Sequence, residues 1–214
     1  MSKTALVIGA TGATGKDLVV QLLEDTAFDK VHVFVRRNVD LHHDKLPVHI
    51  VEFDRMDEWK DLLKGDVLFS ALGTTIKKAG SQQAQWKIDY TYQYEVAKAA
   101  RANGVDTMAL VSSAWATTDS KVFYTRMKGQ LEEDVKKLGF RSLAIMRPPS
   151  LIRKVTDRFG ERISVSLLQA LNKIGLLRSI RPMPTAQVAK AMIAKAQEGK
   201  EGIFTLEPKD LWNV

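Results

Sequence analysis

The stretch TALVIGATGATGKDLVVQLLED, residues 4–25, places an apolar run, a glycine-rich loop and an amphipathic pattern in direct succession. The run is short and aliphatic, which is typical of a buried strand, and residues 13–25 have the apolar spacing of a helix. Gly9, Gly12 and Gly15 lie three positions apart between the two. A strand, a tight glycine turn and a helix in this order predict the first unit of a parallel α/β sheet.

In such a unit the glycine loop predicts a dinucleotide site. Gly9 permits a tight turn, Gly12 lets the backbone approach a pyrophosphate, and Gly15 permits close packing of the helix on the strand. The helix N-terminus presents unpaired N–H groups to the phosphates. A P-loop is excluded, because Lys16 is followed by Asp17 rather than by Ser or Thr. A glycine turn without any ligand is the alternative. The residues expected at the cofactor are Gly9, Thr11, Gly12, Ala13, Thr14 and Gly15.

Five more short apolar runs follow along the chain. They are VHVFV (31–35), VHIVEF (48–53), DVLFSAL (66–72), TMALVSS (107–113) and SLAIM (142–146). Helical patterns at 57–63, 83–103 and 121–138 separate most of them. Strands that are apolar throughout and are joined by helices are buried on both faces of a parallel sheet. The sequence therefore predicts an α/β protein with a doubly wound, Rossmann-type parallel sheet.

The pattern changes after Met146, and we expect a small carboxyl-terminal substrate lobe. The segment RPPSLIRK (147–154) is predicted as a loop and ERISVSLLQALNKIGLL (161–177) as a helix. A further helix is predicted from Pro184 to about Gln197, and IFTLEP (203–208) as a final strand. These residues are too few for an independent second domain. We expect one domain, with a dinucleotide-binding core at 1–148 and the lobe at 149–214.

Composition excludes several classes of protein. With 45% hydrophobic and 27% charged residues in 214, the chain has the composition of a globular domain. No apolar run approaches the roughly 18 residues of a membrane span, and the first residues lead directly into a strand, so we expect a cytoplasmic protein with no membrane partner. The absence of Cys excludes disulfides, thiol nucleophiles and Cys-ligated metals.

Charge and histidine content point to a small-molecule site rather than to a metal or nucleic acid. The formal net charge is +7, but Lys and Arg are scattered, so we do not expect nucleic acid as a partner. Four histidines occur, and adjacent His42 and His43 point in different directions with no carboxylate motif around them. We expect no metal.

The end of the second strand distinguishes NAD from NADP. An NAD site places Asp or Glu there, about 20 residues beyond the glycine loop, to accept the ribose hydroxyls. This chain has VHVFVRRN, so Arg36 and Arg37 occupy that region. A guanidinium can bind a 2′-phosphate, and the sequence therefore predicts NADP(H). Two solvent-exposed arginines without a ligand are the alternative.

Two further loops are expected beside the cofactor. Asp54 follows the third strand, where it would contact an adenine amino group or, equally well, cap the following helix. SALGTT (70–75) ends the fourth strand in small residues, which let the chain pass close to a cofactor. We therefore expect contacts from Leu72, Gly73 and Thr74, with a purely structural turn as the alternative.

The fifth strand and the next helix carry the candidate catalytic residues. Strand 107–113 ends in Ser112 and Ser113 at the edge where α/β sheets bind ligands. In VFYTRMKGQLEEDVKK (122–137), Tyr124 and Lys128 are four positions apart and share one helix face. A Lys ammonium nearby would lower the Tyr124 pKa from its usual value near ~10 and prepare it for acid–base catalysis. The spacing alone is common in ordinary amphipathic helices.

These motifs together resemble a known enzyme family. The elements are GATGATG, SALGTTIKKAGS, KIDYTY, LVSS, the pair Tyr124 and Lys128, and RPPSL, in family order over essentially the whole chain. The chain resembles an extended or atypical short-chain dehydrogenase/reductase, most closely the Tat-interacting-protein branch with its bacterial relatives. The resemblance implies a catalytic constellation of Ser113, Tyr124 and Lys128, with Ser112 as the alternative serine. It also implies that Lys128 binds the nicotinamide ribose, that Arg147 and Pro148 begin the loop beside the nicotinamide, and that Asp89 replaces a structural Asn. Ser113 precedes Tyr124 by fewer positions than is usual in the family.

The function expected from the residues and the resemblance is an NADP(H)-dependent oxidoreductase. It would transfer hydride to or from a small carbonyl or alcohol substrate, as a monomer or homodimer. Two alternatives stay open: an NADPH-sensing regulatory or protein-binding module with little turnover, and, less favoured because the carboxyl-terminal region is short, a nucleotide-sugar epimerase or dehydratase.

Overall fold

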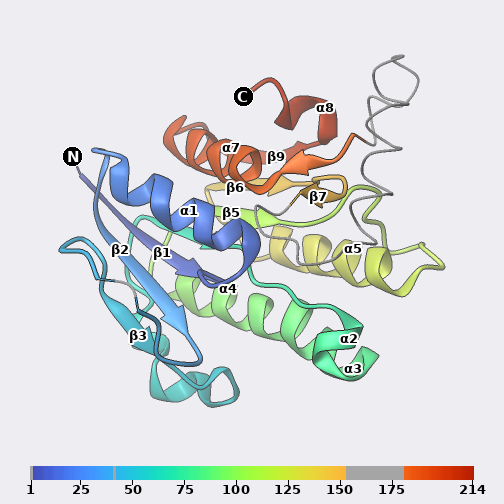
Figure 1. The fold of residues 1–214 in the computed structure, drawn as a ribbon, viewed down its shortest axis with the longest axis horizontal. Helices are drawn as coiled ribbons and strands as arrows, with labels where there is room; N and C mark the ends of the chain where they lie inside the picture. Colours follow the sequence, from blue (N-terminus) through green and yellow to red (C-terminus); the bar gives the residue numbers. More distant parts are fainter. Residues whose placement is uncertain (1, 41, 153–180) are drawn as a thin grey trace.

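The computed structural model of the chain describes residues 2–40, 42–152 and 181–214. Its main sheet has seven parallel strands in the order β3-β2-β1-β4-β5-β6-β9 (Figure 1). The strands are β1 (Lys3–Ile8), β2 (Phe28–Val35), β3 (Val48–Ile50), β4 (Val67–Ser70), β5 (Thr107–Val111), β6 (Ser142–Met146) and β9 (Gly202–Leu206). The doubly wound parallel sheet predicted from the sequence is confirmed.

Helices cover both faces of this sheet (Figure 1). Helices α1 (Ala13–Glu24) and α7 (Thr185–Gln197) pack against each other on one face, and α4 (Tyr92–Ala102) and α5 (Phe123–Lys136) lie on the other. Alternate residues of β1 serve the two cores: Ala5 and Val7 pack toward α1 and α7, and Leu6 and Ile8 toward α4 and α5. Burial on both faces explains why the strands are apolar throughout.

Two predicted helices differ from the structure. Residues 57–63 form no α-helix; two 3₁₀ turns, η1 (Phe53–Glu58) and η2 (Lys60–Leu62), occupy this region. Trp59 between them has φ −140° and ψ −1°, which is not helical, and its indole is buried in the core. Residues 83–103 are helical, but as α3 (Gln82–Trp86), a π-helical turn η3 (Lys87–Thr91) and α4.

The carboxyl-terminal residues extend the main layers. As predicted, α7 begins after Pro184, and β9 is the final strand, hydrogen-bonded to β6. Within the segment predicted as a loop, β7 (Leu151–Ile152) pairs in parallel with β8 (Met183–Pro184). Short helices α2 (Ile76–Ala79) and α8 (Pro208–Leu211) were not predicted. The helix predicted at 161–177 lies outside the described residues. Within the described part of the chain, no helix is long and apolar enough to cross a membrane.

The strand register aligns all the candidate loops at one edge. Ile8 of β1 pairs with Phe34 on one side and with Ser70 on the other, and the strand order reverses at β1 and β4. Across β5 and β6, Val111 pairs with Met146. The loops after β1, β4, β5 and β6 therefore leave the sheet side by side, at the position where α/β sheets bind ligands.

Candidate functional site

A cavity of about 450 Å³ lies at this edge of the sheet. It brings together the loop and first turn of α1, the loop after β4, the end of β5, one face of α5 and the residues around β7 and α7. The lining residues are Thr11, Gly12, Ala13, Thr14, Lys16, Asp17, Ala71, Leu72, Gly73, Thr74, Thr75, Lys78, Val111, Ser112, Tyr124, Lys128, Leu151 and Thr185.

The glycine loop is shaped by backbone packing that only glycine allows. Gly9 has φ +82°, and a Cβ on it would lie 2.4 Å from the backbone of Ala71 and Leu72. A Cβ on Gly15 would lie 2.0 Å from the carbonyl oxygen of Gly9. Gly9 thus turns the chain against the loop after β4, and Gly15 seats α1 on that turn. Both residues lie behind the cavity wall and shape it.

The N-terminus of α1 opens into the cavity. Its N-cap is Gly12, with no side-chain cap, so the first N–H groups of a 12-residue helix face the cavity without a competing side chain. Lys16 and Lys78 also line it. The Thr185 hydroxyl donates to Asp17 Oδ2 at 2.6 Å and joins α1 to α7. Free helix N–H groups beside lysines are the donor set that a pyrophosphate needs, so the residues present fit a dinucleotide.

Arg36 and Arg37 immediately follow β2 and are exposed. Because Ile8 pairs with Phe34, Gly9 lies level with Val35, and the two arginines come next beside the glycine loop. Neither guanidinium forms an ion pair with a carboxylate of the described residues, and neither lines the cavity. Their position suits a phosphate on the far ribose, and that contact stays a prediction.

Asp54 lies near the same end of the crevice and has other partners. Its carboxylate is 2.6 Å from Lys87 Nζ and accepts a hydrogen bond from the Tyr92 hydroxyl at 2.9 Å. The bond from Lys87 is the main cause that lowers the Asp54 pKa. The helix-capping alternative is wrong, because η1 starts after Glu52 without a side-chain cap. A contact between Asp54 and adenine stays a prediction.

The start of α5 is fixed by the loop that follows β5. Thr117 N–H donates to Thr125 O, and Ser120 Oγ lies 2.6 Å from Thr125 Oγ1. A Cβ on Gly129 would lie 2.3 Å from the Thr117 backbone, so a glycine directly after Lys128 lets the loop lie against the helix. This packing turns Tyr124 and Lys128 into the cavity, where the sequence predicted them.

Lys128 is held between two buried carboxylates. Its side chain is 2% exposed, and its Nζ donates to Val111 O at 3.3 Å. Burial lowers its pKa, while the charges of Asp89 and Glu132 oppose that change. Asp89 is also buried and accepts from Thr74 N–H at 2.6 Å and from Gln85 Nε2 at 3.3 Å. Asp89 therefore ties η3 to the loop after β4 and places a negative charge beside Lys128.

The pKa of Tyr124 moves in the direction opposite to our expectation. The side chain is 37% exposed, but burial and, secondarily, the negative charge of Asp89 raise its pKa to about 12. The prediction that Lys128 lowers this pKa is wrong, because the Lys128 ammonium is shared with Asp89 and Glu132. Tyr124 consequently keeps its proton at neutral pH.

The two serines after β5 differ in their surroundings. Ser112 is buried, lines the cavity and donates its hydroxyl proton to Glu132 Oε1 at 2.5 Å. Ser113 is half-buried, lies beside the lining residues and donates to the neighbouring Ala114 O at 3.2 Å. The structure thus brings Ser112 into the cavity, whereas the sequence favoured Ser113.

Arg147 and Pro148 directly follow β6 and join neighbouring segments of the chain. Arg147 forms ion pairs with Glu132 and Glu207, which raise its pKa, chiefly through the bond to Glu132. Pro148 O accepts from Ala114 N–H, which joins the loops after β5 and β6. Neither residue lines the cavity, and their expected proximity to a nicotinamide stays a prediction.

Nine of the predicted residues line the cavity: Thr11, Gly12, Ala13, Thr14, Leu72, Gly73, Thr74, Tyr124 and Lys128. Eight further lining residues were not predicted: Lys16, Asp17, Ala71, Thr75, Lys78, Val111, Leu151 and Thr185. Several of these have a visible signal. Lys16 and Asp17 occupy the first turns after the glycine loop, and Thr185 directly follows the proline that starts α7.

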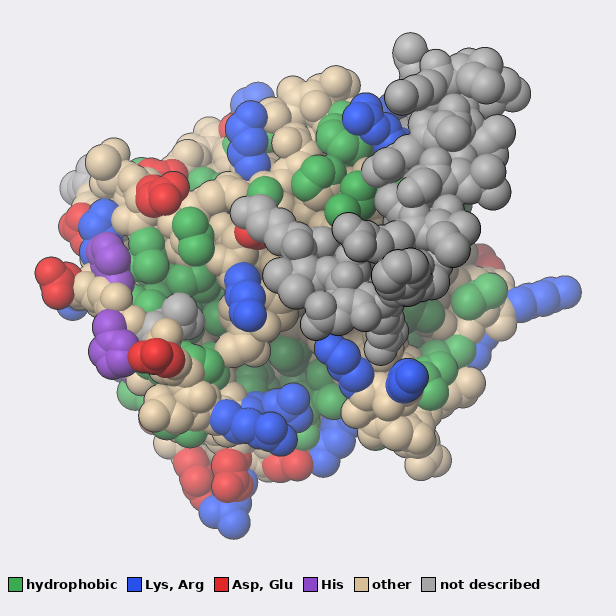
Figure 2. All heavy atoms as spheres, in the orientation of Figure 1, with side chains coloured by type: hydrophobic (Ala, Val, Ile, Leu, Met, Phe, Trp, Pro, Cys, Tyr) green, Lys and Arg blue, Asp and Glu red, His purple; other side chains and the backbone are tan. Residues whose placement is uncertain are grey.

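Titratable and charged groups also lie away from the cavity in the part of the chain that the structure describes. Across the described residues, no three His, Asp or Glu side chains are placed to hold a metal ion. His32 and His49 stack on each other, with Nδ1 of the first 2.8 Å from Nε2 of the second. On the face in Figure 2, Lys and Arg side chains lie in several separate groups.

Comparisons with known proteins agree with this geometry. Residues 9–198 match the family model described as NAD(P)H-binding. A relative in Candida albicans, Protein FMP52, mitochondrial, is 33% identical over 206 residues, which cover 93% of this chain and 90% of that protein. This relative's name contradicts the cytoplasmic location expected from the sequence.

Two solved structures share the fold. A structure of MoeE5 in complex with UDP-glucose and NAD has a TM-score of 0.71 at 17% identity, covering 95% of this chain and 75% of that one. A short chain dehydrogenase family protein from Francisella tularensis has a TM-score of 0.65 at 14% identity, covering 98% of this chain and 99% of that one. At these identities the similarity establishes the Rossmann-type fold.

Proposed function

Because the chain belongs to the NAD(P)H-binding family, we propose that it is an NADP(H)-dependent oxidoreductase of the short-chain dehydrogenase/reductase type. It would transfer hydride to or from a small carbonyl or alcohol substrate. The observation that carries the proposal is the shared cavity: Tyr124 and Lys128 face the same space as the glycine loop and the N-terminus of α1. A proton donor and a pyrophosphate site within one cavity are what a carbonyl reductase requires.

In the reduction of a carbonyl compound, each side chain of the site would have its own role. A bound nicotinamide cofactor supplies or accepts the hydride. Tyr124 is protonated at neutral pH, so it can donate its hydroxyl proton to the alkoxide that forms from a carbonyl, because an alkoxide is more basic than a phenolate. Lys128, which lines the same cavity, would bind the nicotinamide ribose. The role assigned to Ser113, a hydrogen bond to the substrate oxygen, would require its hydroxyl to leave Ala114 O and turn toward the cavity.

The preference for NADP(H) is supported by Arg36 and Arg37. They are exposed, follow β2 directly beside the glycine loop, and have no carboxylate partner among the described residues. No Asp or Glu occupies the two positions after the strand where an NAD ribose would be bound. Within the reductases, the kinship with the Tat-interacting-protein branch is likewise a proposal, supported by SALGTT and KAG in the loop after β4.

Replacement of Tyr124 by Phe tests the role of the hydroxyl. NADPH oxidation is measured with a panel of aldehydes and ketones, and NADPH affinity by fluorescence titration. We expect turnover to fall about 10²- to 10⁴-fold with unchanged NADPH affinity. Tyr94→Phe is the matched control, because Tyr94 stacks on Tyr90 outside the cavity. Full turnover in Tyr124→Phe would remove the proposed acid.

A second function is favoured by the raised pKa of Tyr124. A phenol with a pKa of about 12 is a weak acid, which suits a cofactor-sensing module better than a fast reductase. That function predicts tight NADPH binding, no oxidation with any carbonyl compound of the panel, and affinity for a protein partner that changes with the nucleotide. The panel that tests Tyr124 therefore separates the two functions in the unmodified protein.

A further inference from the structure

A buried acidic residue follows the Tyr124 and Lys128 pair on the same helix. Glu132 comes four positions after Lys128 and eight after Tyr124, so all three lie along one face of α5. The side chain of Glu132 is 1% exposed. A carboxylate in such surroundings costs several kcal/mol unless it is paired and hydrogen-bonded. The hydrogen-bond and ion-pair partners of Glu132 therefore indicate its role.

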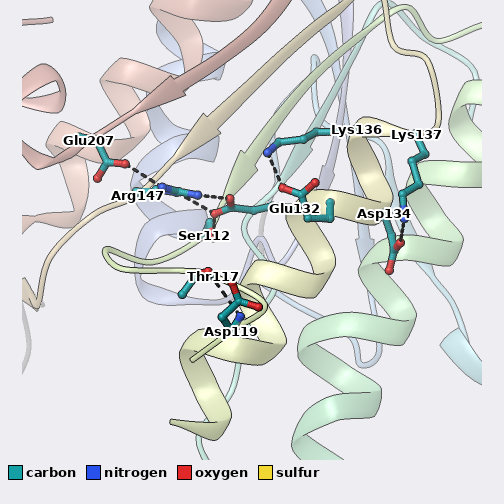
Figure 3. A network of polar contacts seen from close by, with 10 residues as sticks. Ser112, Thr117, Asp119, Glu132, Asp134, Lys136, Lys137, Arg147 and Glu207 are labelled. Carbon is teal, nitrogen blue, oxygen red and sulfur yellow. Dashed lines mark hydrogen bonds and ion pairs between the residues drawn. The ribbon is translucent and has the colours of Figure 1, made fainter. Parts of the chain in front are cut away.

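Glu132 is bonded on both oxygens (Figure 3). Arg147 Nε donates to Oε1 at 3.1 Å, and an Arg147 terminal nitrogen donates to Oε2 at 2.6 Å. The other terminal nitrogen of Arg147 donates to Glu207 at 2.8 Å, at the start of α8. Arg147 thus joins α5 to the carboxyl-terminal segment and fixes the orientation of the Glu132 carboxylate.

The remaining partner of Glu132 is Ser112, which lines the cavity. The Ser112 hydroxyl donates to Glu132 Oε1 at 2.5 Å. A serine hydroxyl has one proton and two lone pairs, and an ionised carboxylate can only accept. The proton of Ser112 is therefore held away from the cavity, toward which only its lone pairs remain available. A carbonyl oxygen in the cavity would receive no hydrogen bond from Ser112, whereas a ligand hydroxyl or amide could donate to it.

We propose that Glu132 is a positioning residue of the site, which fixes Ser112 as a hydrogen-bond acceptor toward the cavity and keeps a negative charge beside Lys128. The effect on turnover rests on the proposed function; the effects on Ser112 and Lys128 do not. The pairing leaves Ser112 as an acceptor toward the cavity, while the Ser113 hydroxyl donates to Ala114 O beside it. It also places Lys128 between Asp89 from η3 and Glu132 from its own helix.

The first test measures the charge on Lys128 without any substrate. Protein labelled with ¹³C at the lysine ε carbons is titrated by NMR, and the Lys128 signal is assigned by its loss in Lys128→Met. In Glu132→Gln we expect the Lys128 midpoint to move to lower pH by on the order of one pH unit, because a neighbouring negative charge is gone. Glu133→Gln is the matched control, since Glu133 is exposed on the same helix and pairs with Lys136. An unchanged Lys128 midpoint in folded Glu132→Gln would overturn the proposal that Glu132 keeps a negative charge beside Lys128.

The second test does not depend on the folding of Glu132→Gln, which leaves Arg147 without its buried partner. A buried hydroxyl proton that is bonded to a carboxylate exchanges slowly and is visible by proton NMR. The buried Thr185 hydroxyl, which donates to Asp17, should give a signal of this kind in every variant. We expect a further signal in the unmodified protein, lost in Ser112→Ala and retained in Ser113→Ala. Its persistence in Ser112→Ala, or its loss in Ser113→Ala, would overturn the assignment of the serines.

Turnover separates failure of this proposal from failure of the proposed reaction. If the unmodified protein oxidises NADPH with the carbonyl panel, Glu132→Gln should lower kcat and move the pH profile, while Glu133→Gln should change neither. If nothing in the panel is reduced, the reductase function fails, and the two NMR tests still decide the role of Glu132. A lowered kcat with an unmoved pH profile would reduce Glu132 to a purely structural residue.

Discussion

The glycine-loop half of the crevice holds its shape through backbone packing, whereas the α5 half holds its shape through buried charges. In the first half, Gly9 and Gly15 let three backbone segments approach closely. In the second, carboxylates compensate Lys128 and Arg147: Glu132 of α5 serves both, Asp89 serves Lys128, and Glu207 serves Arg147. A backbone arrangement tolerates no added Cβ, and a charge network tolerates no missing partner. The two halves should therefore fail in different ways when a residue is replaced.

The largest effect is expected where the charge network is broken. Arg147→Met leaves Glu132 buried without its counter-ion, which typically costs about 3–5 kcal/mol of unfolding free energy. Equilibrium urea denaturation measures this loss. Arg141→Met is the matched control, because Arg141 forms an exposed pair with Glu201 at 3.6 Å, worth under about 1 kcal/mol. Equal losses in the two variants would mean that the buried pair does not hold the α5 half together.

A smaller loss of unfolding free energy is expected for a substitution in the glycine-loop half. Gly15 lies inside α1, where Ala is ordinarily preferred over Gly by about 1 kcal/mol. Here the new Cβ would lie 2.0 Å from the Gly9 carbonyl oxygen, so Gly15→Ala should instead destabilise the protein by about 2–3 kcal/mol. Thermal and urea unfolding give the sign directly. Gly12→Ala, whose Cβ would lie 3.2 Å from the same oxygen, should cost less. A gain in stability for Gly15→Ala would contradict the packing.

The same difference explains what the sequence predicted. Glycine spacing is a local signal, so the first half could be inferred from residues 4–25 alone. The charge network joins residues from separate elements. Glu132 on α5 pairs with Arg147, which follows β6, and the charge of Asp89 in η3 acts on Lys128 of α5. No periodicity marks such pairs or the burial of one side chain, so the pKa of Tyr124, which burial and secondarily Asp89 raise, was predicted in the wrong direction. The helix expected at 57–63 failed for a related reason, because burial of Trp59 in the core outweighed its helical spacing.

Some of the missed elements did carry a local signal. Thr75 caps α2 by accepting from Lys78 N–H, and Glu207 and Asp210 form a capping box around α8. Both helices have four residues, too short for an apolar period to show. Caps therefore mark helix starts that hydrophobic spacing cannot.

A third prediction tests whether positive charge beside the glycine loop contributes to cofactor binding. Replacing both Arg36 and Arg37 by Ala should weaken NADPH binding by tenfold or more, about 1.4 kcal/mol, and leave NADH binding unchanged. Fluorescence titration with each nucleotide measures this ratio. Arg141→Ala is the control. Arg141 is also exposed, but it directly precedes β6 and therefore lies at the edge of the sheet opposite to the cavity. An equal loss for NADH would show that general positive charge acts there, without a phosphate contact.

The smallest effect concerns the stacked rings of His32 on β2 and His49 on β3, on the side of the sheet next to β1. Burial lowers the pKa of both from 6.5, and the charge of His49 lowers that of His32 further. The unfolded chain therefore binds protons more readily than the folded one as the pH falls below about 6.5, so stability present above that pH is lost on acidification. Because both rings are partly exposed, solvent screening keeps the loss under about 1 kcal/mol.

Urea unfolding at neutral pH and near pH 5 detects this loss as a lower midpoint. His49→Gln should show a shallower dependence on pH than the unmodified protein, since one titrating ring and its repulsion with His32 are gone. His42→Gln, an exposed ring beyond β2, should keep the full dependence. If His49→Gln and the unmodified protein lose the same stability, the pair does not titrate with folding.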